Sequence, residues 1–148
     1  MKEATTTEEL EDAFEAHRKQ TERHVQRLEK TFEMLNLPAQ AIKCEAIDGL
    51  IKEARTTINE TKKGSMTRDA ALIIAAQKVE HYEIATYGGL VALAMTLGKK
   101  RIAELLDKTL EEEEETDKKL TDIAEGCVNI EAEEEPMVET RRELFEMV

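Results

Sequence analysis

Apolar side chains recur every three or four residues along most of the chain, which is the period of a helix and not of a strand. A first helix is expected to follow the capping residues Thr5, Thr6 and Thr7 and to run to about residue 35, before Pro38. The same spacing predicts further helices over about residues 39–62, 67–97 and 99–125. No segment alternates with a period of two, so no strand is expected.

Glycines separate the predicted helices. Residues 62–65 combine two cations, a glycine terminator and a serine cap, and Gly98 and Gly126 are expected to end the third and fourth helices. After an acidic stretch, Pro136 favours the start of a short amphipathic helix over residues 139–148. The chain therefore divides into a helical bundle domain at 1–130 and an acidic linker with a short helix at 131–148. Long helices joined by short turns predict an all-α antiparallel bundle.

Polar side chains interrupt the apolar stripe of three predicted helices near their middles. The stripe of the fourth helix contains Glu113 and Asp117, one turn apart, and that of the third contains Glu80 with Glu83 beside it. Two histidines, His17 and His24, lie seven residues apart on the stripe of the first helix, and the list of candidate groups is therefore Glu80, Glu83, Glu113, Asp117, His17 and His24. Unpaired buried carboxylates are costly, so these groups must face one another, water or a cation.

Oxygen and imidazole ligands that converge from several helices are how a four-helix bundle holds iron or manganese. Other interpretations remain open. In the run 111–115, Glu111, Glu112, Glu114 and Glu115 are expected to form a solvated face. Glu113 and Asp117 can line a wet seam or pair with histidine or arginine, and the two histidines can be ordinary polar residues at the bundle edge. His81, which lies off the stripe, is expected to support rather than ligate.

Composition excludes several classes of function. The 148 residues carry 21 basic and 33 acidic side chains, a formal net charge of −12, which argues against a nucleic-acid partner. No apolar run approaches the roughly 20 residues needed to span a bilayer, so no membrane partner is expected. The sequence begins without a signal-peptide pattern, and its two isolated cysteines, Cys44 and Cys127, indicate small buried thiols in a reducing cytoplasm, with a bridge between them left open. No motif assigns a catalytic residue or an organic cofactor.

Several stretches of the chain resemble one known family. They are residues 43–51, 68–73 and 76–85, of which the last reads AQKVEHYEIA, together with 109–113 and 116–117. From about residue 5 to 132 the chain is similar to the YciF/YciE family of ferritin-like bacterial stress proteins.

This resemblance implies a ferritin-like bundle, commonly a homodimer, with a carboxylate-bridged di-iron or di-manganese site. It implies that Glu80 and Glu83 on the third helix and Glu113 and Asp117 on the fourth face the metals. The first helix would contribute His17, position 20 and His24. The implied chemistry is oxidation of Fe(II) or reduction of peroxide or dioxygen.

Two departures from the family pattern bear on the metal site. Position 20 is usually Glu in the family but is Gln20 here, a poorer ligand for a hard cation. The usual first helix of the fold is also expected to be lacking, which would leave an apolar groove for a second copy of the chain to fill. An alternative is therefore a metal-free stress or interaction protein that kept the bundle. A third interpretation is an acidic module that docks a partner through residues 131–148.

Overall fold

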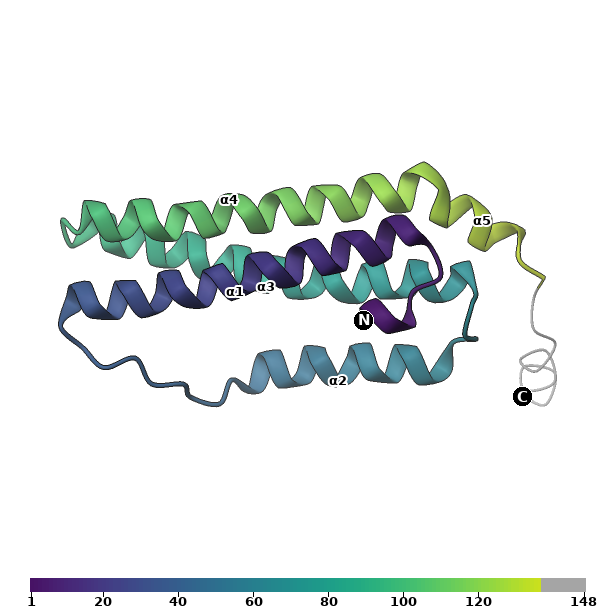
Figure 1. Cartoon of the computed structure of the whole chain (residues 1–148), viewed down its shortest axis with the longest axis horizontal. Helices are drawn as coiled ribbons and strands as arrows, with labels where there is room; N and C mark the ends of the chain where they lie inside the picture. Colours follow the sequence, from purple (N-terminus) through teal and green to yellow (C-terminus); the bar gives the residue numbers. More distant parts are fainter. Residues whose placement is uncertain (137–148) are drawn as a thin grey trace, which may run out of the picture.

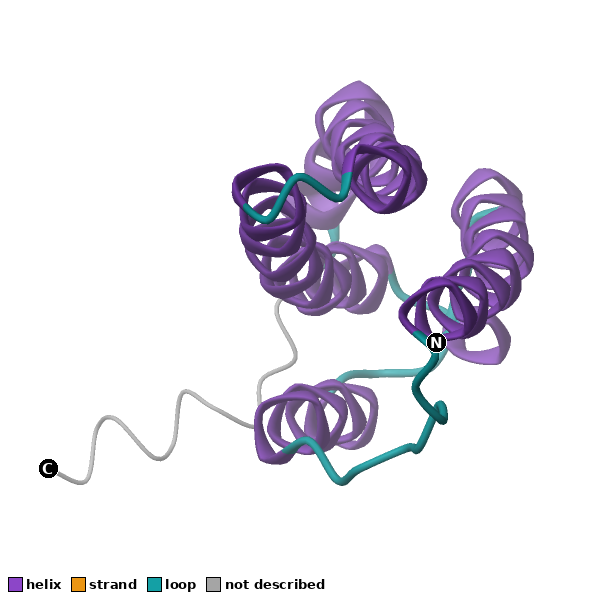
Figure 2. Ribbon diagram, turned by 90° about the vertical axis from the view of Figure 1, so that its left-hand side faces the viewer, coloured by secondary structure: helices purple, strands orange, loops and turns teal. Residues whose placement is uncertain are grey.

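Four long helices, seen in a computed structural model that describes residues 1–136, run alternately in opposite directions along one axis (Figure 1). They are α1 (Glu8–Leu35), α2 (Glu45–Glu60), α3 (Met66–Thr96) and α4 (Lys100–Ile123). A short 3₁₀ turn, η1 (Lys2–Ala4), precedes them, and a π-helical turn, η2 (Ala124–Val128), continues into α5 (Asn129–Glu134). The described residues contain helices and loops and no strand (Figure 2), which confirms the all-α bundle.

Most helix ends follow the signals in the sequence. Gly64 and Gly98 adopt positive φ angles of 78° and 69°, which L side chains rarely adopt, and so end one helix and reset the chain direction. Ser65 caps α3 because its hydroxyl accepts a hydrogen bond from the Arg68 backbone N–H. Asn36, the only non-glycine residue with positive φ in residues 1–136, ends α1 before Pro38.

Two predicted boundaries are wrong. The second helix begins at Glu45 and not at residue 39, because the segment from Leu37 to Cys44 is non-helical. Gly126 does not end a helix, because the backbone passes through it in η2 and remains helical to Glu134. Val128 is fully buried against the core formed with Leu120 and Ile123, and this packing holds the chain helical past the glycine. The predicted short helix at 139–148 lies outside the described residues.

Helix α4 packs between α1 and α3, while α2 packs chiefly on α3. Two apolar clusters fill the interior. One lies at the start of α1 and the end of α4, and its buried members include Leu10, Ile73 and Leu120. The other surrounds the turn between α3 and α4 and includes Tyr87 and Leu106. The polar residues predicted at mid-seam fall between these two clusters along the sequence of each helix.

Buried charges near the start of α3 hold the neighbouring helices. The carboxylate of Asp69 accepts hydrogen bonds from the backbone N–H groups of Thr6 and Thr7 and from the Thr7 hydroxyl. The guanidinium of Arg68 donates to the carbonyls of Ile58 and Thr61, the last residues before the turn into α3. Because both side chains are buried, they fix the start of α1 and the end of α2 relative to α3.

Within residues 1–136, no helix combines the length and the apolar character needed to cross a membrane. Both cysteines are free and partly buried, so they form no bridge.

Candidate metal centre

Four ligand-type side chains from three helices meet in the middle of the bundle. They are His17 on α1, Glu80 and Glu83 on α3, and Glu113 on α4, and one ligand atom of each lies within 4.8 Å of those of the others. All four were among the predicted ligands, three from their position on the stripes and Glu83 from its position beside one and from the family resemblance. The convergence follows from helix geometry, because each side chain occupies the interior face of its helix near mid-length.

The carboxylates of this cluster lack hydrogen-bond partners. Glu113 is fully buried, and neither of its oxygens accepts a hydrogen bond. Glu80 is 3% exposed, and its Oε2 atom is also without a partner. A buried carboxyl group without hydrogen-bond partners lowers the stability of the fold by about 1–3 kcal/mol, and by more when it is ionised. A cation between them would remove that cost, so the residues present fit a bound metal.

The pKa values of the cluster residues also favour a bound cation. Burial, helped by the nearby charge of Glu113, raises the pKa of Glu80 to about 9 and that of Glu83 to about 7. Burial lowers the pKa of His17, so its imidazole is neutral near pH 7. Metal-free protein therefore holds protons at the carboxyl groups that a cation would displace, and it offers a neutral imidazole nitrogen.

The hydrogen bonds around His17 fix which ring nitrogen faces the carboxylates. The Thr116 hydroxyl donates to the carbonyl of Glu112 at 2.9 Å, so it accepts from His17 Nδ1–H at 3.1 Å. The other ring nitrogen, Nε2, lies 3.4 Å from Glu80 Oε1 and 3.8 Å from Glu113 Oε2, and it is also 3.5 Å from the Thr21 hydroxyl. An outer partner that orients a histidine in this way is typical of metal ligation.

His24 lies beside the same cluster. Its Nδ1 atom is 3.0 Å from Glu113 Oε1, but the two atoms do not form a hydrogen bond, and Nδ1 is buried without a partner. The rings of His17 and His24 are 6.4 Å apart. The two imidazoles thus face different oxygens of one carboxylate, Glu113.

Two predicted ligands lie elsewhere. Asp117 accepts a hydrogen bond from Gln77 Nε2 at 3.1 Å and contacts His81 Nε2 at 3.3 Å, and it is not part of the four-residue cluster. Its negative charge still contributes to the raised pKa of Glu80. Gln20 is half-buried and lies close enough to His17 to act on the pKa of the imidazole, but it is not part of the four-residue cluster. His81 is largely exposed, in keeping with a supporting role.

The expectation that Glu112 belongs to a solvated face is wrong. Its carboxylate accepts hydrogen bonds from Arg27 at 2.7 and 3.0 Å and from His24 Nε2–H at 2.7 Å. These contacts, first of all that with Arg27, lower the pKa of Glu112 to about 2. Sequence reasoning missed Arg27 altogether, although it follows His24 by three residues and so lies on the same side of α1. Glu111, Glu114 and Glu115 are exposed as expected.

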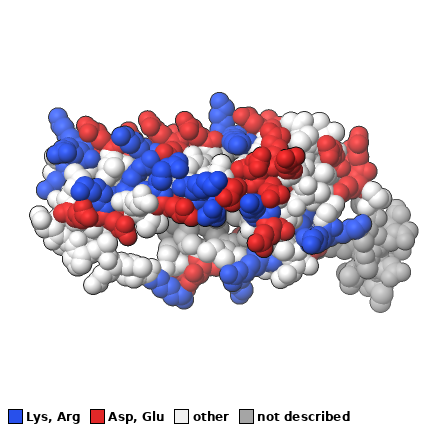
Figure 3. Space-filling model, viewed as in Figure 1, with Lys and Arg blue, Asp and Glu red and all other residues white. Residues whose placement is uncertain are grey.

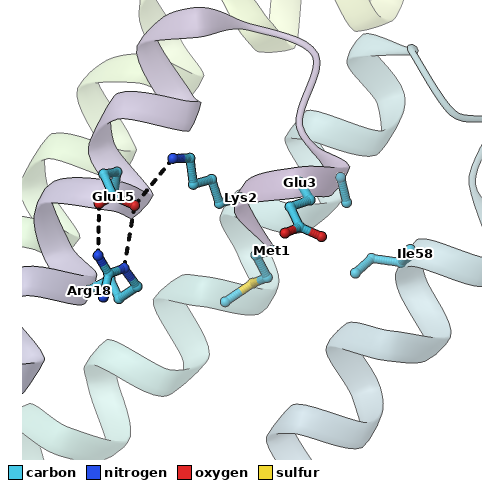
Figure 4. Close-up of a pocket in the computed structure, with 7 residues that line it drawn as sticks. Met1, Lys2, Glu3, Glu15, Arg18 and Ile58 are labelled. Carbon is cyan, nitrogen blue, oxygen red and sulfur yellow. Dashed lines mark hydrogen bonds and ion pairs between the residues drawn. The ribbon is translucent and has the colours of Figure 1, made fainter.

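A hollow in the described part of the chain lies away from this cluster. It lies between η1, α1 and α2, has a volume of about 610 Å³, and is lined by residues that include Lys2, Glu15 and Arg18 (Figure 4). Lys2 and Arg18 both bind the Glu15 carboxylate, at 3.2 and 2.9 Å. None of its lining residues belongs to the cluster.

The fold and the cluster together place the chain in a class of proteins. These are all-helical bundles with a candidate metal centre of imidazoles and carboxylates between the helices. Residues 1–133 match the family described as "Domain of unknown function (DUF892)", and the chain belongs to it. It is similar to Protein YciF of Escherichia coli strain K12, with 51% identity over 131 residues, 88% of this chain and 78% of that protein.

Two solved structures are also similar. The crystal structure of the E. coli stress protein YciF matches with a TM-score of 0.81 and 50% identity, and covers 86% of this chain and 80% of that one. YcfI of Rhodopseudomonas palustris, a protein proposed to be structural, matches with a TM-score of 0.76 and 39% identity, over 81% and 76% of the two chains. The family resemblance expected from the sequence is therefore confirmed.

Proposed function

We propose that the protein binds a pair of divalent cations, iron or manganese, between α1, α3 and α4. The observation that carries this proposal is Glu113, which is fully buried with both oxygens unpartnered and one imidazole facing each of them. A carboxylate in that position would help to hold both cations. Imidazole and carboxylate ligands together suit iron and manganese.

The remaining ligands would divide between the two cations. His17 lies 3.4 Å from Glu80, and these two residues would hold one cation with Glu113. Glu83, one turn further along α3, is close enough to His24 for the charge of the imidazole to affect its pKa, and these two would hold the second cation. Asp117 is excluded from both groups by its contacts with Gln77 and His81.

Bound iron or manganese would supply one-electron chemistry toward peroxide or dioxygen, or oxidation of Fe(II) itself. The chain's own contribution is to exclude water, to orient the two imidazoles and to hold protons at Glu80 and Glu83 whenever the cations are absent. By likeness to the E. coli stress protein YciF, we propose a setting in the response to stress, where control of free iron or peroxide is useful.

Metal analysis tests the proposal directly. Protein purified without chelator and reconstituted with anaerobic Fe(II) or with Mn²⁺ should bind two ions per chain, measured by elemental analysis. Glu113→Gln should bind at least tenfold more weakly, because it removes the shared ligand, whereas Glu114→Gln, an exposed neighbour with the same charge change, should behave as wild type. Wild-type protein that stays free of metal under these conditions would refute the proposal.

The competing function is a metal-free bundle in a stress or interaction role. Gln20 favours it, since a neutral amide stands beside His17 where the family pattern has an acid. In that case Glu80→Ala and Glu113→Ala would leave the metal content at zero and would raise the melting temperature, because each variant removes a buried carboxyl group that lacks partners.

A further inference from the structure

A chain of polar contacts runs from the candidate metal centre to the partly exposed edge of α1 and α4. Glu113 faces His24, His24 donates through Nε2–H to Glu112, and Glu112 is gripped by both terminal nitrogens of Arg27. Arg27 also donates to the hydroxyl of Thr109, which is fully buried. Solvent exposure increases along these contacts, because His24 is 2% exposed whereas Glu112 and Arg27 are partly exposed.

The contact with Glu112 determines which nitrogen of His24 carries hydrogen. A carboxylate that is held by an arginine fork is ionised and accepts only, so the nitrogen 2.7 Å from it must be the donor. Nε2 therefore carries hydrogen, and in the neutral ring the lone pair belongs to Nδ1. Nδ1 is buried, has no hydrogen-bond partner, and lies 3.0 Å from Glu113 Oε1. At this separation, one cation would be held by Nδ1 of His24 and Oε1 of Glu113 together.

We propose that Glu112, held by Arg27, is a positioning residue that turns His24 into a ligand of the second cation and so makes the two metal positions unequal. The inference rests on the proposed two-cation centre and adds to it a residue that the sequence pattern assigned to the solvent. A carboxylate bound to the far nitrogen of a ligating histidine orients the ring and increases its basicity.

The two histidines differ in this outer partner. His17 is oriented by the neutral hydroxyl of Thr116, whereas His24 is oriented by an anion that is itself neutralised by Arg27. The position that contains His24 should therefore depend on the Glu112 side chain, and the position that contains His17 should not. Thr116 bonds the backbone carbonyl of Glu112, so a change of the Glu112 side chain leaves that contact in place.

The test is a titration of the full chain with Mn²⁺, followed by electron paramagnetic resonance and by elemental analysis. Wild type should bind two ions and show the signal of an exchange-coupled pair. Glu112→Gln should lose most of the second ion, with affinity reduced 10- to 100-fold, and should show the six-line signal of one isolated Mn²⁺. Glu111→Gln is the matched control, because Glu111 is an exposed neighbour and the charge change is the same.

Arg27→Lys is the second variant. It keeps one positive charge but loses the paired grip on Glu112, so it should weaken the second position less than Glu112→Gln does. The melting temperature of each metal-free variant shows that the bundle is folded. A Glu112→Gln protein that still holds a coupled pair overturns the inference and leaves the two-cation centre standing. Wild type without any bound Mn²⁺ overturns both, and loss of both ions in Glu112→Gln overturns the inequality of the two positions.

Discussion

At the scale of single residues, the candidate centre is defined by what its carboxylates lack. A buried acid normally has hydrogen-bond donors around it, and Asp69 shows that this bundle can supply them. Glu80 and Glu113 lie equally deep without such donors, and the imidazole nitrogen nearest to Glu113 is without a partner too. In metal-free protein, a proton neutralises Glu80, and His24 lies 3.0 Å from Glu113, where the contacts with Glu113 and Glu112 outweigh burial and raise the pKa of the imidazole.

This protonation predicts a pH dependence of stability. The pKa of Glu80 is raised to about 9 in the folded chain, while an unfolded glutamate ionises near 4.5, so the folded state binds the extra proton between these values. Its contribution to stability is therefore lost as the pH rises through about 9. The melting temperature of chelator-treated protein should fall from pH 7 to pH 9. His17, whose pKa is lowered, is neutral in both states above pH 7 and adds nothing in this window.

Metal binding should show the opposite trend, because protons and cations compete for the same carboxyl groups. Mn²⁺ affinity should rise from pH 6 to pH 8 with release of protons, measured by calorimetry in buffers of different ionisation enthalpy. A Glu80→Gln variant supplies the control, since it should lose most of the fall in melting temperature above pH 7. An unchanged pH profile in that variant would contradict the assignment to Glu80.

At the scale of elements, the glycines show how far local signals reach. Gly64, Gly98 and Gly126 look alike in sequence as helix terminators, and the first two do adopt the left-handed conformation that ends a helix. Gly126 lies within a π-helical turn, because the burial of Val128 outweighs the weak helix preference of one glycine. Packing of the following residues, which the local pattern does not contain, decides this case.

A pair of alanine substitutions tests this difference. Gly98→Ala forces a side chain into a φ of 69° and should destabilise the protein by about 1 kcal/mol. Gly126→Ala sits in a helical turn where a Cβ meets no atom within 4 Å, so it should stabilise by up to about 1 kcal/mol. Urea denaturation of both variants measures the two changes. Destabilisation by Gly126→Ala comparable to that by Gly98→Ala would contradict the helical path through Gly126.

At the scale of the whole molecule, the surface combines many charged side chains with exposed apolar side chains on α3. Acidic and basic side chains cover much of the face seen in Figure 3, consistent with the net charge of −12. Several large apolar side chains on α3 are nevertheless exposed, among them Ile74, Leu90 and Leu93, at 57%, 38% and 60%. Such exposed groups on a helical bundle are candidates for contact with another copy.

The homodimer expected from the family resemblance stays a prediction, and these side chains suggest how to test it. Wild type should sediment with about twice the chain mass of 16.8 kDa. Leu93→Lys should shift the equilibrium toward the monomer by at least tenfold in dissociation constant, because it buries a charge in an apolar contact. Val25→Lys on α1, also an exposed apolar site, serves as the comparison. Wild type that sediments as a monomer at all concentrations would contradict the prediction.

The sequence alone determined the helical class, most helix ends and six of the side chains in and around the centre, because helical periodicity assigns residues to a face without reference to any neighbour. It also carried the family, since a local stretch such as residues 76–85 is specific by itself. Tertiary structure decided which polar groups on a face meet. Asp117 and Glu112 each lie within four residues of Glu113, yet Asp117 pairs with Gln77 and His81, and Glu112 with His24 and Arg27. The physical reason is that a helix stripe gives a direction only to within about 100°, whereas hydrogen-bond partners depend on how neighbouring helices are rotated and shifted along each other.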